Sequence, residues 1–198
     1  MCQTVADQTS TSIVLSVQAT DIKAVADAVS LPVFAQHVDG VGYGSHTGHM
    51  LPQAVKAAGA TGTLLNHSED PYDKDSLKAA IDACKEQGLY TICCAPTTEA
   101  SAECAKLGPD AIAVEPPELI GSGISVSTAQ PELVTATVDA VKQVAHIPVL
   151  TGAGVVTDTD VSKALELGTK GVLLASGVLK AENPEQALRT LLKGLTAQ

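Results

Sequence analysis

Seven short apolar segments alternate with segments of helical periodicity, and this alternation restricts the possible fold more than any other feature. The predicted strands are residues 13–17, 32–35, 62–65, 90–94, 111–114, 147–150 and 171–175. The predicted helices are residues 21–30, 52–58, 75–87, 98–106, 131–144, 158–167 and 184–195. Strict strand–helix alternation predicts parallel strands joined by right-handed crossovers. It fits a closed barrel, which usually has eight strand–helix units, or an open doubly wound sheet.

Prolines and glycines at the ends of the predicted helices support these boundaries. Pro131 and Pro184 stand where the first helical residue is expected, each followed by a glutamate, and a proline is well tolerated there. Four glycines mark helix ends, at positions 59, 88, 108 and 168. No linker divides the sequence, so we expect a single α/β domain over residues 1–198.

Composition excludes several functional classes. No apolar run approaches the roughly 20 residues that a membrane helix needs, and no signal peptide opens the sequence, so we expect a cytoplasmic protein that binds no membrane. The net charge of −10 argues against a nucleic-acid partner. The cysteines lack the spacing of a metal site and are expected to be reduced thiols: Cys2, Cys84, Cys93, Cys94 and Cys104.

An apolar run ends in a carboxylate at residues 111–115, Ala-Ile-Ala-Val-Glu. Four apolar residues between turn formers predict a strand buried on both faces, with Glu115 at its carboxyl end, where parallel α/β folds place catalytic groups. Glu115 is either a catalytic base or a solvated carboxylate that points into water. The next segment has prolines at its start and glycines at its end, which suits a closing lid: Pro116, Pro117, Glu118, Leu119, Ile120, Gly121, Ser122 and Gly123.

His67 follows another predicted buried strand, in the segment Asn-His-Ser-Glu at 66–69. It is either an imidazole tied to a helix N-terminus or an electrophile that donates a hydrogen bond to a substrate carbonyl while a carboxylate removes the adjacent proton. A glycine-rich loop at 38–49 carries His46 and His49. Two histidines do not complete a metal site, so no metal is predicted and contact with another subunit is the expected role of this loop.

Two further loops are predicted to bind an anion. Residues 151–155, Thr-Gly-Ala-Gly-Val, and residues 175–178, Ala-Ser-Gly-Val, each follow a predicted strand. Their small side chains allow backbone N–H groups to converge on a phosphate. The alternative is a pair of ordinary tight turns. The full dinucleotide fingerprint is absent, so no cofactor is predicted.

Taken together, these segments resemble triosephosphate isomerase in its short archaeal form. The resemblance runs from about residue 12 to the C-terminus and includes residues 18–22, 34–39, 44–49, 66–69, 113–123, 152–154 and 171–177. It implies a TIM-type (βα) barrel of parallel strands, here with seven βα units, and a small phosphorylated triose as substrate. It also implies a homo-oligomer, either a dimer or a tetramer, in which Thr47 lies in a loop that reaches a neighbouring subunit.

The resemblance assigns roles to individual residues. Glu115 is the base that moves a proton between C1 and C2 of dihydroxyacetone phosphate and glyceraldehyde 3-phosphate, His67 polarises the carbonyl oxygens, and residues 116–123 form the lid. The residues expected around the substrate phosphate are Gly121, Ser127, Gly152, Ala153, Gly154, Ala175 and Ser176.

Two departures from the family qualify this expectation. The family opens with a strand that carries Asn-x-Lys, whereas residues 1–10 are polar and resemble the remnant of a first helix. The basic residues that usually follow His-Ser-Glu are replaced by Asp70 and Pro71. We therefore expect an isomerase of reduced activity. The alternatives are a silent barrel that binds a phosphorylated metabolite or assists assembly, and a sequence whose first strand lies before Met1.

Overall fold

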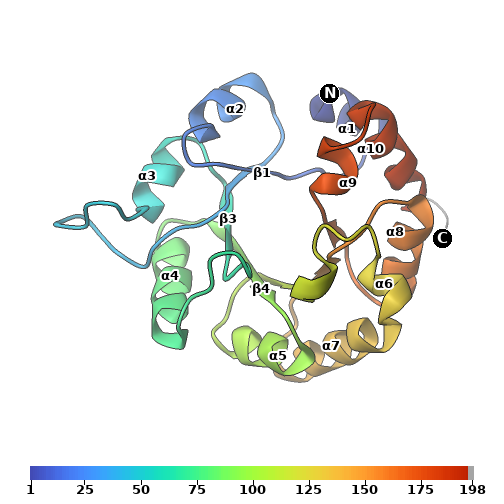
Figure 1. Cartoon of the computed structure of the whole chain (residues 1–198). Helices are drawn as coiled ribbons and strands as arrows, with labels where there is room; N and C mark the ends of the chain where they lie inside the picture. Colours follow the sequence, from blue (N-terminus) through green and yellow to red (C-terminus); the bar gives the residue numbers. More distant parts are fainter. Residues whose placement is uncertain (196–198) are drawn as a thin grey trace. The chain divides into compact units, whose positions relative to one another are not determined.

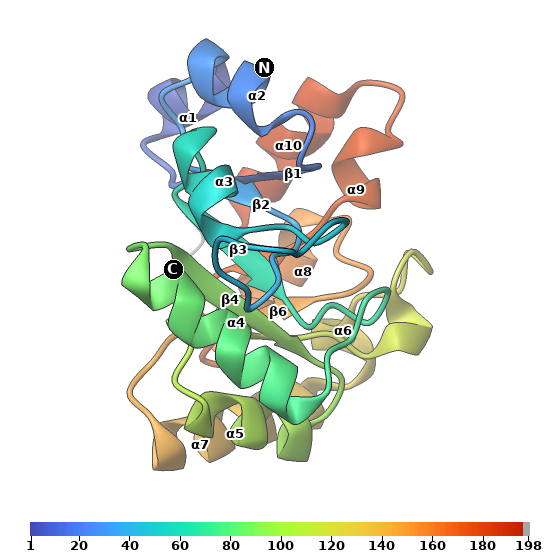
Figure 2. The same cartoon turned by 90° about the vertical axis from the view of Figure 1, so that its left-hand side faces the viewer.

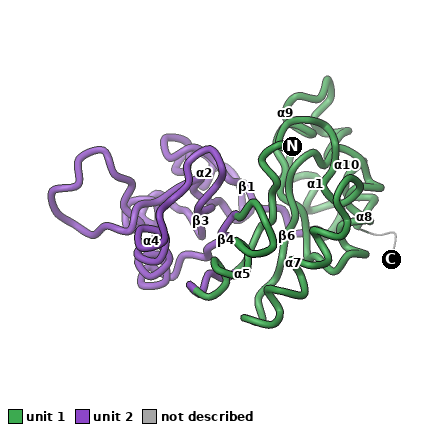
Figure 3. Tube along the Cα trace, turned by 60° about the horizontal axis from the view of Figure 1, so that its bottom comes forward, with its two compact units in different colours: residues 1–11, 95–106, 111–198 green, residues 12–94, 107–110 purple. Residues whose placement is uncertain are grey.

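The computed structural model describes residues 1–195, which form two compact units (Figure 3). Unit 1 comprises residues 1–11, 95–106 and 111–195, and unit 2 comprises residues 12–94 and 107–110. The chain thus passes between the units several times. The expected single domain stays a prediction, and the units are described separately below.

Unit 2 contains four parallel strands that pair in chain order: β1 (Leu15–Val17), β2 (Val33–Ala35), β3 (Gly62–Leu65) and β4 (Tyr90–Ala95). Its helices are α2 (Ile22–Ala28), α3 (Pro52–Ala57) and α4 (Lys74–Glu86). Helix α2 packs on β2 and α4 packs on β3 (Figure 2). All four residues of β3 are buried, as the continuous apolar run predicts for a strand covered on both faces.

Unit 1 contains three parallel strands in chain order: β5 (Ala111–Val114), β6 (Val149–Gly152) and β7 (Val172–Leu173). Its helices are α1 (Cys2–Thr9), α5 (Thr98–Lys106), the 3₁₀-helix η1 (Pro117–Leu119), α6 (Val126–Ala129), α7 (Pro131–Val144), α8 (Asp158–Glu166), α9 (Ser176–Leu179) and α10 (Pro184–Lys193). Every residue of β5 is at most 1% exposed, so this strand forms the centre of the unit's core.

The first helix belongs to the same unit as the last one. Helix α1 packs against α10 (Figure 1), with Val5 fully buried. The Arg189 guanidinium donates to Gln8 Oε1 over 2.7 Å. The prediction of a helix within residues 1–10 is confirmed.

Seven strands, each followed by at least one helix, confirm the predicted α/β class with seven βα units. Pro131 and Pro184 do begin helices, and the four marker glycines adopt the left-handed conformation that ends a helix. Five of the seven strands differ in extent from the prediction by one residue or more, and the differences are largest at the last two. The strand predicted at 147–150 begins only after Pro148, which lacks a donor for a strand ladder, and β7 is only two residues long. Within residues 1–195, no helix is long and apolar enough to cross a membrane.

Candidate active site

Glu115 directly follows β5 and is 7% exposed. Its backbone N–H donates to the Ala95 carbonyl over 2.9 Å, which fixes the point where the chain leaves the strand. Its carboxylate lies against Gly152 at the end of β6, so closely that a Cβ at position 152 would be 2.1 Å from Oε1. The carboxylate is therefore held inside unit 1, and the alternative of a side chain that points into water is wrong.

The segment after Glu115 is ordered by its own contacts. Leu119 is buried against Val126, Val134 and Ala153, which attaches the middle of the predicted lid to the core of unit 1. The Ser122 hydroxyl donates to the Leu119 carbonyl over 2.8 Å and closes a turn. Both predicted hinge glycines have positive φ, 72° at position 121 and 75° at position 123, a conformation that side chains disfavour.

The small-residue loops of unit 1 touch one another. A Cβ at Gly154 would be 1.8 Å from the Ile124 carbonyl oxygen, and a Cβ at Gly177 would be 2.5 Å from the Val155 carbonyl oxygen. Ala153 has φ of 75°, which is unusual for a residue with a side chain and marks strained backbone. Unit 1 therefore brings together Glu115, the end of the lid and both predicted phosphate loops.

The Ser127 hydroxyl has partners within the fold. It donates to the Asp160 carbonyl over 2.9 Å and lies 2.8 Å from the Ser125 hydroxyl, and the residue is fully buried. Its contact with a phosphate stays a prediction.

Asp160 was not identified from the sequence as part of this region. Its Oδ2 accepts from the N–H groups of Val156 and Thr157 over 3.1 and 2.9 Å, and Thr128 donates to Oδ1 over 3.2 Å. Burial opposes ionisation, but the hydrogen bonds from Thr157, Val156 and Thr128 prevail and lower the pKa of Asp160. Asp160 thereby links Thr128, in the segment after the lid, to Val156 and Thr157, in the loop after β6. The signal that could have found it is Thr157-x-x-Asp160, a capping box with aspartate in place of glutamate.

His67 lies in unit 2, two residues after β3. The Glu69 backbone N–H donates to Nδ1 over 3.3 Å. A ring nitrogen that accepts a hydrogen bond carries no proton, so the neutral ring has its proton on Nε2. The Glu69 carboxylate also lies 3.5 Å from Nδ1, which is an ion pair only if the ring is protonated, and that carboxylate is largely exposed. The Glu69 backbone N–H is therefore the contact that sets the tautomer of the His67 ring.

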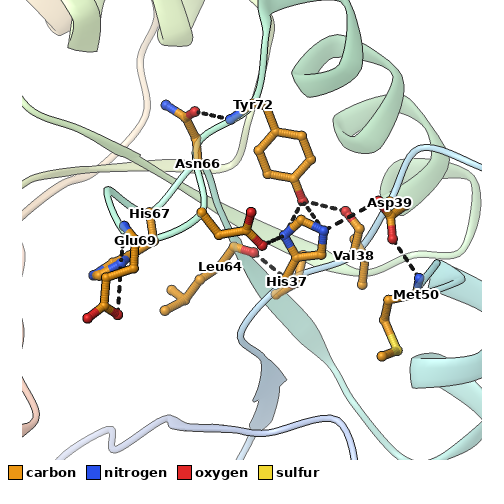
Figure 4. Close-up of polar contacts among 11 residues, drawn as sticks. His37, Val38, Asp39, Met50, Leu64, Asn66, His67, Glu69 and Tyr72 are labelled. Atoms are coloured by element: carbon orange, nitrogen blue, oxygen red, sulfur yellow. Dashed lines mark hydrogen bonds and ion pairs between the residues drawn. The ribbon is translucent and has the colours of Figure 1, made fainter. Parts of the chain in front are cut away.

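The loop that carries His67 is held by its neighbours (Figure 4). Asn66 has φ of 59°, and its side chain joins the Cys94 carbonyl at 2.9 Å to the Tyr72 N–H at 3.0 Å. Tyr72 in turn stacks on His37 with ring centroids 4.9 Å apart. Asp70 lies 3.1 Å from His37 Nδ1. Its carboxylate thus has a partner in the same unit.

Thr47 is exposed in the loop between β2 and α3, which projects from the rest of unit 2 (Figure 1). Asp39 closes the base of this loop through two bonds to Met50: Asp39 N–H to the Met50 carbonyl at 2.8 Å, and Met50 N–H to Asp39 Oδ2 at 2.6 Å. Tyr43 within the loop is 83% exposed. Over the described part of the chain, no group of three or more His, Cys, Asp or Glu side chains could hold a metal ion.

A sequence model of the family described as triosephosphate isomerase matches residues 1–193. The chain belongs to the triosephosphate isomerase family. It is 47% identical to the triosephosphate isomerase of Methanosarcina barkeri over 193 residues, which cover 97% of this chain and 87% of the relative. It is 47% identical to that of Methanocaldococcus jannaschii over 194 residues, 98% and 89% of the two chains. The identity to the enzyme of Metallosphaera sedula is 45% over 190 residues, 96% and 83%.

Membership of the triosephosphate isomerase family confirms the family, the TIM-type α/β fold and the isomerase class predicted from the sequence. The comparisons give no support to the alternative of a catalytically silent barrel. The roles of individual residues stay predictions, because similarity over the whole chain does not show what each side chain does.

Proposed function

We propose that the chain interconverts dihydroxyacetone phosphate and glyceraldehyde 3-phosphate through an enediolate, with Glu115 as the base and His67 as the electrophile. The observation that supports this most strongly is the burial of the Glu115 carboxylate at the carboxyl end of β5, against Gly152 and at the start of the lid segment. A base enclosed in this way is shielded from water, which prevents loss of the reactive intermediate.

The proposed isomerisation moves protons within one substrate and needs no cofactor. Glu115 takes a proton from the carbon beside the substrate carbonyl, and the C–H electron pair forms the carbon–carbon double bond of the enediolate. The carbonyl oxygen gains the negative charge and takes a proton from His67 Nε2. The hydroxyl on the neighbouring carbon returns a proton to Nε2, and its oxygen becomes the new carbonyl oxygen. Return of the proton from Glu115 to the other carbon completes the conversion, so the base is regenerated in each cycle.

His67 suits the electrophilic role because of its tautomer. With Nδ1 occupied by the Glu69 N–H, the Nε2–H of the neutral ring is the group that donates to a substrate oxygen. A neutral imidazole paired with a glutamate base is the known arrangement of triosephosphate isomerase, so these roles come from the family and the tautomer from the geometry.

Phosphate binding is assigned to the backbone of the contacting loops in unit 1. An anionic substrate approaches a protein of net charge −10, so local donors must overcome the overall field. Small residues give a phosphate access to backbone N–H groups. We assign this role to Gly121, Ser127, Gly152, Ala153, Gly154, Ala175 and Ser176.

The remaining expectations follow from the family. We infer a cytoplasmic homo-oligomer, a dimer or a tetramer, with Thr47 in the contact between subunits. The acidic balance disfavours nucleic acid as a partner.

Glu115→Gln tests the proposal. The amide cannot act as a base, so we expect kcat to fall by at least about a hundredfold, the scale of general-base catalysis. Incorporation of deuterium from D₂O into the carbon-bound position of the product should fall in parallel, because the exchanging proton resides on Glu115. Glu132→Gln, at an exposed carboxylate on α7 of the same unit, is the matched control and should retain turnover. An unchanged rate in Glu115→Gln would assign the chemistry to another residue.

A further inference from the structure

Tyr72 occupies a position that the proposed chemistry does not use, yet it bonds to both loops at the carboxyl ends of β2 and β3. Its hydroxyl donates to the Val38 carbonyl over 2.5 Å, and its backbone N–H donates to Asn66 Oδ1 over 3.0 Å (Figure 4). The first bond reaches the loop that carries Thr47, and the second reaches the residue before His67. Tyr72 therefore connects the two loops through both ends of a single residue.

The hydroxyl group of Tyr72 is a permanent donor. Burial raises the pKa of Tyr72 well above its usual value; the hydrogen bond to Val38 opposes this shift, and the field of the Asp39 and Asp70 carboxylates adds to it. The hydroxyl has one proton, and a carbonyl oxygen can only accept, so that proton goes to Val38. The His37 ring nitrogens lie 2.9 and 3.3 Å from the Tyr72 oxygen, and which of them bonds to it depends on the tautomer of the ring.

His37 supports the Tyr72 ring from one face. The two rings are nearly parallel, with an interplanar angle of 11°. The carboxylates of Asp39 and Asp70 lie on different ring nitrogens, at 3.5 Å from Nε2 and 3.1 Å from Nδ1. Asp39 is fixed in turn by the Met50 N–H. The base of the β2–α3 loop is therefore linked to Tyr72 through His37 and Asp39.

Asn66 transmits this constraint to His67. Its left-handed backbone is disfavoured for most residues with a side chain but accepted by asparagine, and the bonds of its amide to Cys94 and Tyr72 hold it there. The backbone conformation of Asn66 sets the position and direction of the next residue, His67. Loss of either side-chain bond leaves the direction of the imidazole less defined.

We propose that Tyr72 is a positioning residue for the isomerase reaction: by bridging Val38 and Asn66, it holds His67 in the orientation in which Nε2–H faces the substrate. This inference rests on the proposed function for its catalytic consequence, while the orientation of His67 is a property of the free protein. Asp70 and Tyr72, together with His37, thus support this loop.

Tyr72→Phe is the central test, because it removes the hydroxyl and keeps both the ring stack and the backbone N–H. We expect kcat to fall about tenfold, the scale of one lost hydrogen bond, with KM within about twofold of the original value. We also expect the ¹⁵N resonances of the His67 ring to shift in the free protein. A purely structural role would change the free energy of unfolding and neither of these quantities.

Two tyrosine variants are matched controls for the same chemical change. Tyr43→Phe alters an exposed ring in the Thr47 loop, and Tyr90→Phe removes a hydroxyl that donates to the Asp110 carbonyl at 3.3 Å in the same unit. Both should keep kcat and the His67 resonances. Tyr90→Phe also shows what the loss of a similar hydrogen bond does to stability alone.

Asn66→Gly provides an independent variant, because glycine accepts the left-handed backbone but has no side chain to bridge Cys94 and Tyr72. It should reproduce the Tyr72→Phe effects, and the double variant should lose less than the product of the single losses, since both act on one connection. If Tyr72→Phe does not fold, Asn66→Gly is judged by the same readouts.

The outcomes separate the inference from the proposed function. Unchanged kcat and unchanged His67 resonances in a folded Tyr72→Phe protein overturn the positioning role. If the unmodified protein shows no isomerisation but Tyr72→Phe still shifts the His67 resonances, the proposed function fails while the positioning of His67 stands. If the resonances do not shift either, both fail.

Discussion

The carboxylate of Glu115 and the backbone of Gly152 are in direct contact, with no room for a Cβ at position 152: such an atom would lie 2.1 Å from Oε1 and 2.6 Å from Cδ. The absence of a side chain at the end of β6 thus defines where the carboxylate at the end of β5 lies. The two strands are neighbours in register, Val114 opposite Thr151, so the contact follows from sheet pairing.

Gly152→Ala should therefore displace the Glu115 carboxylate. We expect kcat to fall by about a hundredfold, which is the cost of moving a catalytic group by roughly 1 Å. The measurement is kcat and KM with glyceraldehyde 3-phosphate, together with the free energy of unfolding. Gly42→Ala is the control, because nothing lies within 4 Å of a Cβ there. A fully active Gly152→Ala protein would exclude Glu115 as the base in the conformation described.

Inorganic phosphate should bind the contacting loops of unit 1. In a titration followed by NMR, we expect the amide resonances of Gly154, Ala175 and Ser176 to move at millimolar phosphate, because backbone N–H groups are the proposed donors. The Ser76 amide, which already donates to Asp73 at a helix start over 2.9 Å, is the internal control and should remain in place. Loop amides that stay still would contradict the assignment of the phosphate site.

Asp160→Ala should destabilise the protein at neutral pH by about 1–2 kcal/mol, the usual cost of a lost helix cap. The pKa of Asp160 in the folded protein is lower than its ordinary value of 3.8, so the ionised group stabilises the fold above that pH. As the pH falls below 3.8, this contribution is lost. The difference in unfolding free energy between the two proteins should consequently narrow between pH 7 and about pH 3.

Asp160→Asn offers a control for side-chain volume in the same measurement. It keeps one acceptor oxygen and should be less destabilising than Asp160→Ala at pH 7. A difference between Asp160→Ala and the original protein that stays constant across the pH range would mean that the charge of Asp160 makes no contribution.

Stability should also fall at high pH because of Cys84. Burial on α4, followed by the field of Asp110, raises the pKa of this thiol from 9.0 to about 12. The unfolded chain releases the thiol proton above pH 9 whereas the folded chain retains it until about pH 12, so the folded state loses up to about 1.4 kcal/mol per pH unit in this window. Cys84→Ala should show a shallower decline in unfolding free energy between these pH values.

The control for this experiment is Cys2→Ala, which removes a half-exposed thiol on α1. It should decline with pH as steeply as the original protein. Equal slopes for Cys84→Ala and the original protein would rule out a buried, protonated thiol at position 84.

Local patterns explain why much of the fold was predictable. An uninterrupted Ala-Ile-Ala-Val run predicts a strand covered on both faces, and β5 is buried throughout. Such a strand also indicates where its last residue emerges, which is why Glu115 could be located from five consecutive residues. Prolines at 131 and 184 defined helix starts through backbone chemistry that needs no tertiary information.

The missed features depend on contacts between distant residues. Tyr72 and His37 are 35 positions apart, and nothing in either local sequence indicates that their rings stack. The four-residue α6 is too short for a periodic pattern, and it is held instead by the Val126 N–H bond to the Ala153 carbonyl at 3.3 Å. Pairings of this kind became visible only in the three-dimensional structure.

The packing of α1 against α10 has a consequence for the order of events during synthesis. Unit 2 is almost one continuous stretch of chain, so its four strands can pair while later residues are still being added. Unit 1 joins the first residues to the last helix, and the Gln8–Arg189 bond spans 181 positions. During synthesis, α1 therefore lacks its packing partner, and the apolar face around Val5 stays uncovered until α10 has left the ribosome. Chaperone binding to nascent chains should concentrate in this interval and end when Arg189 emerges.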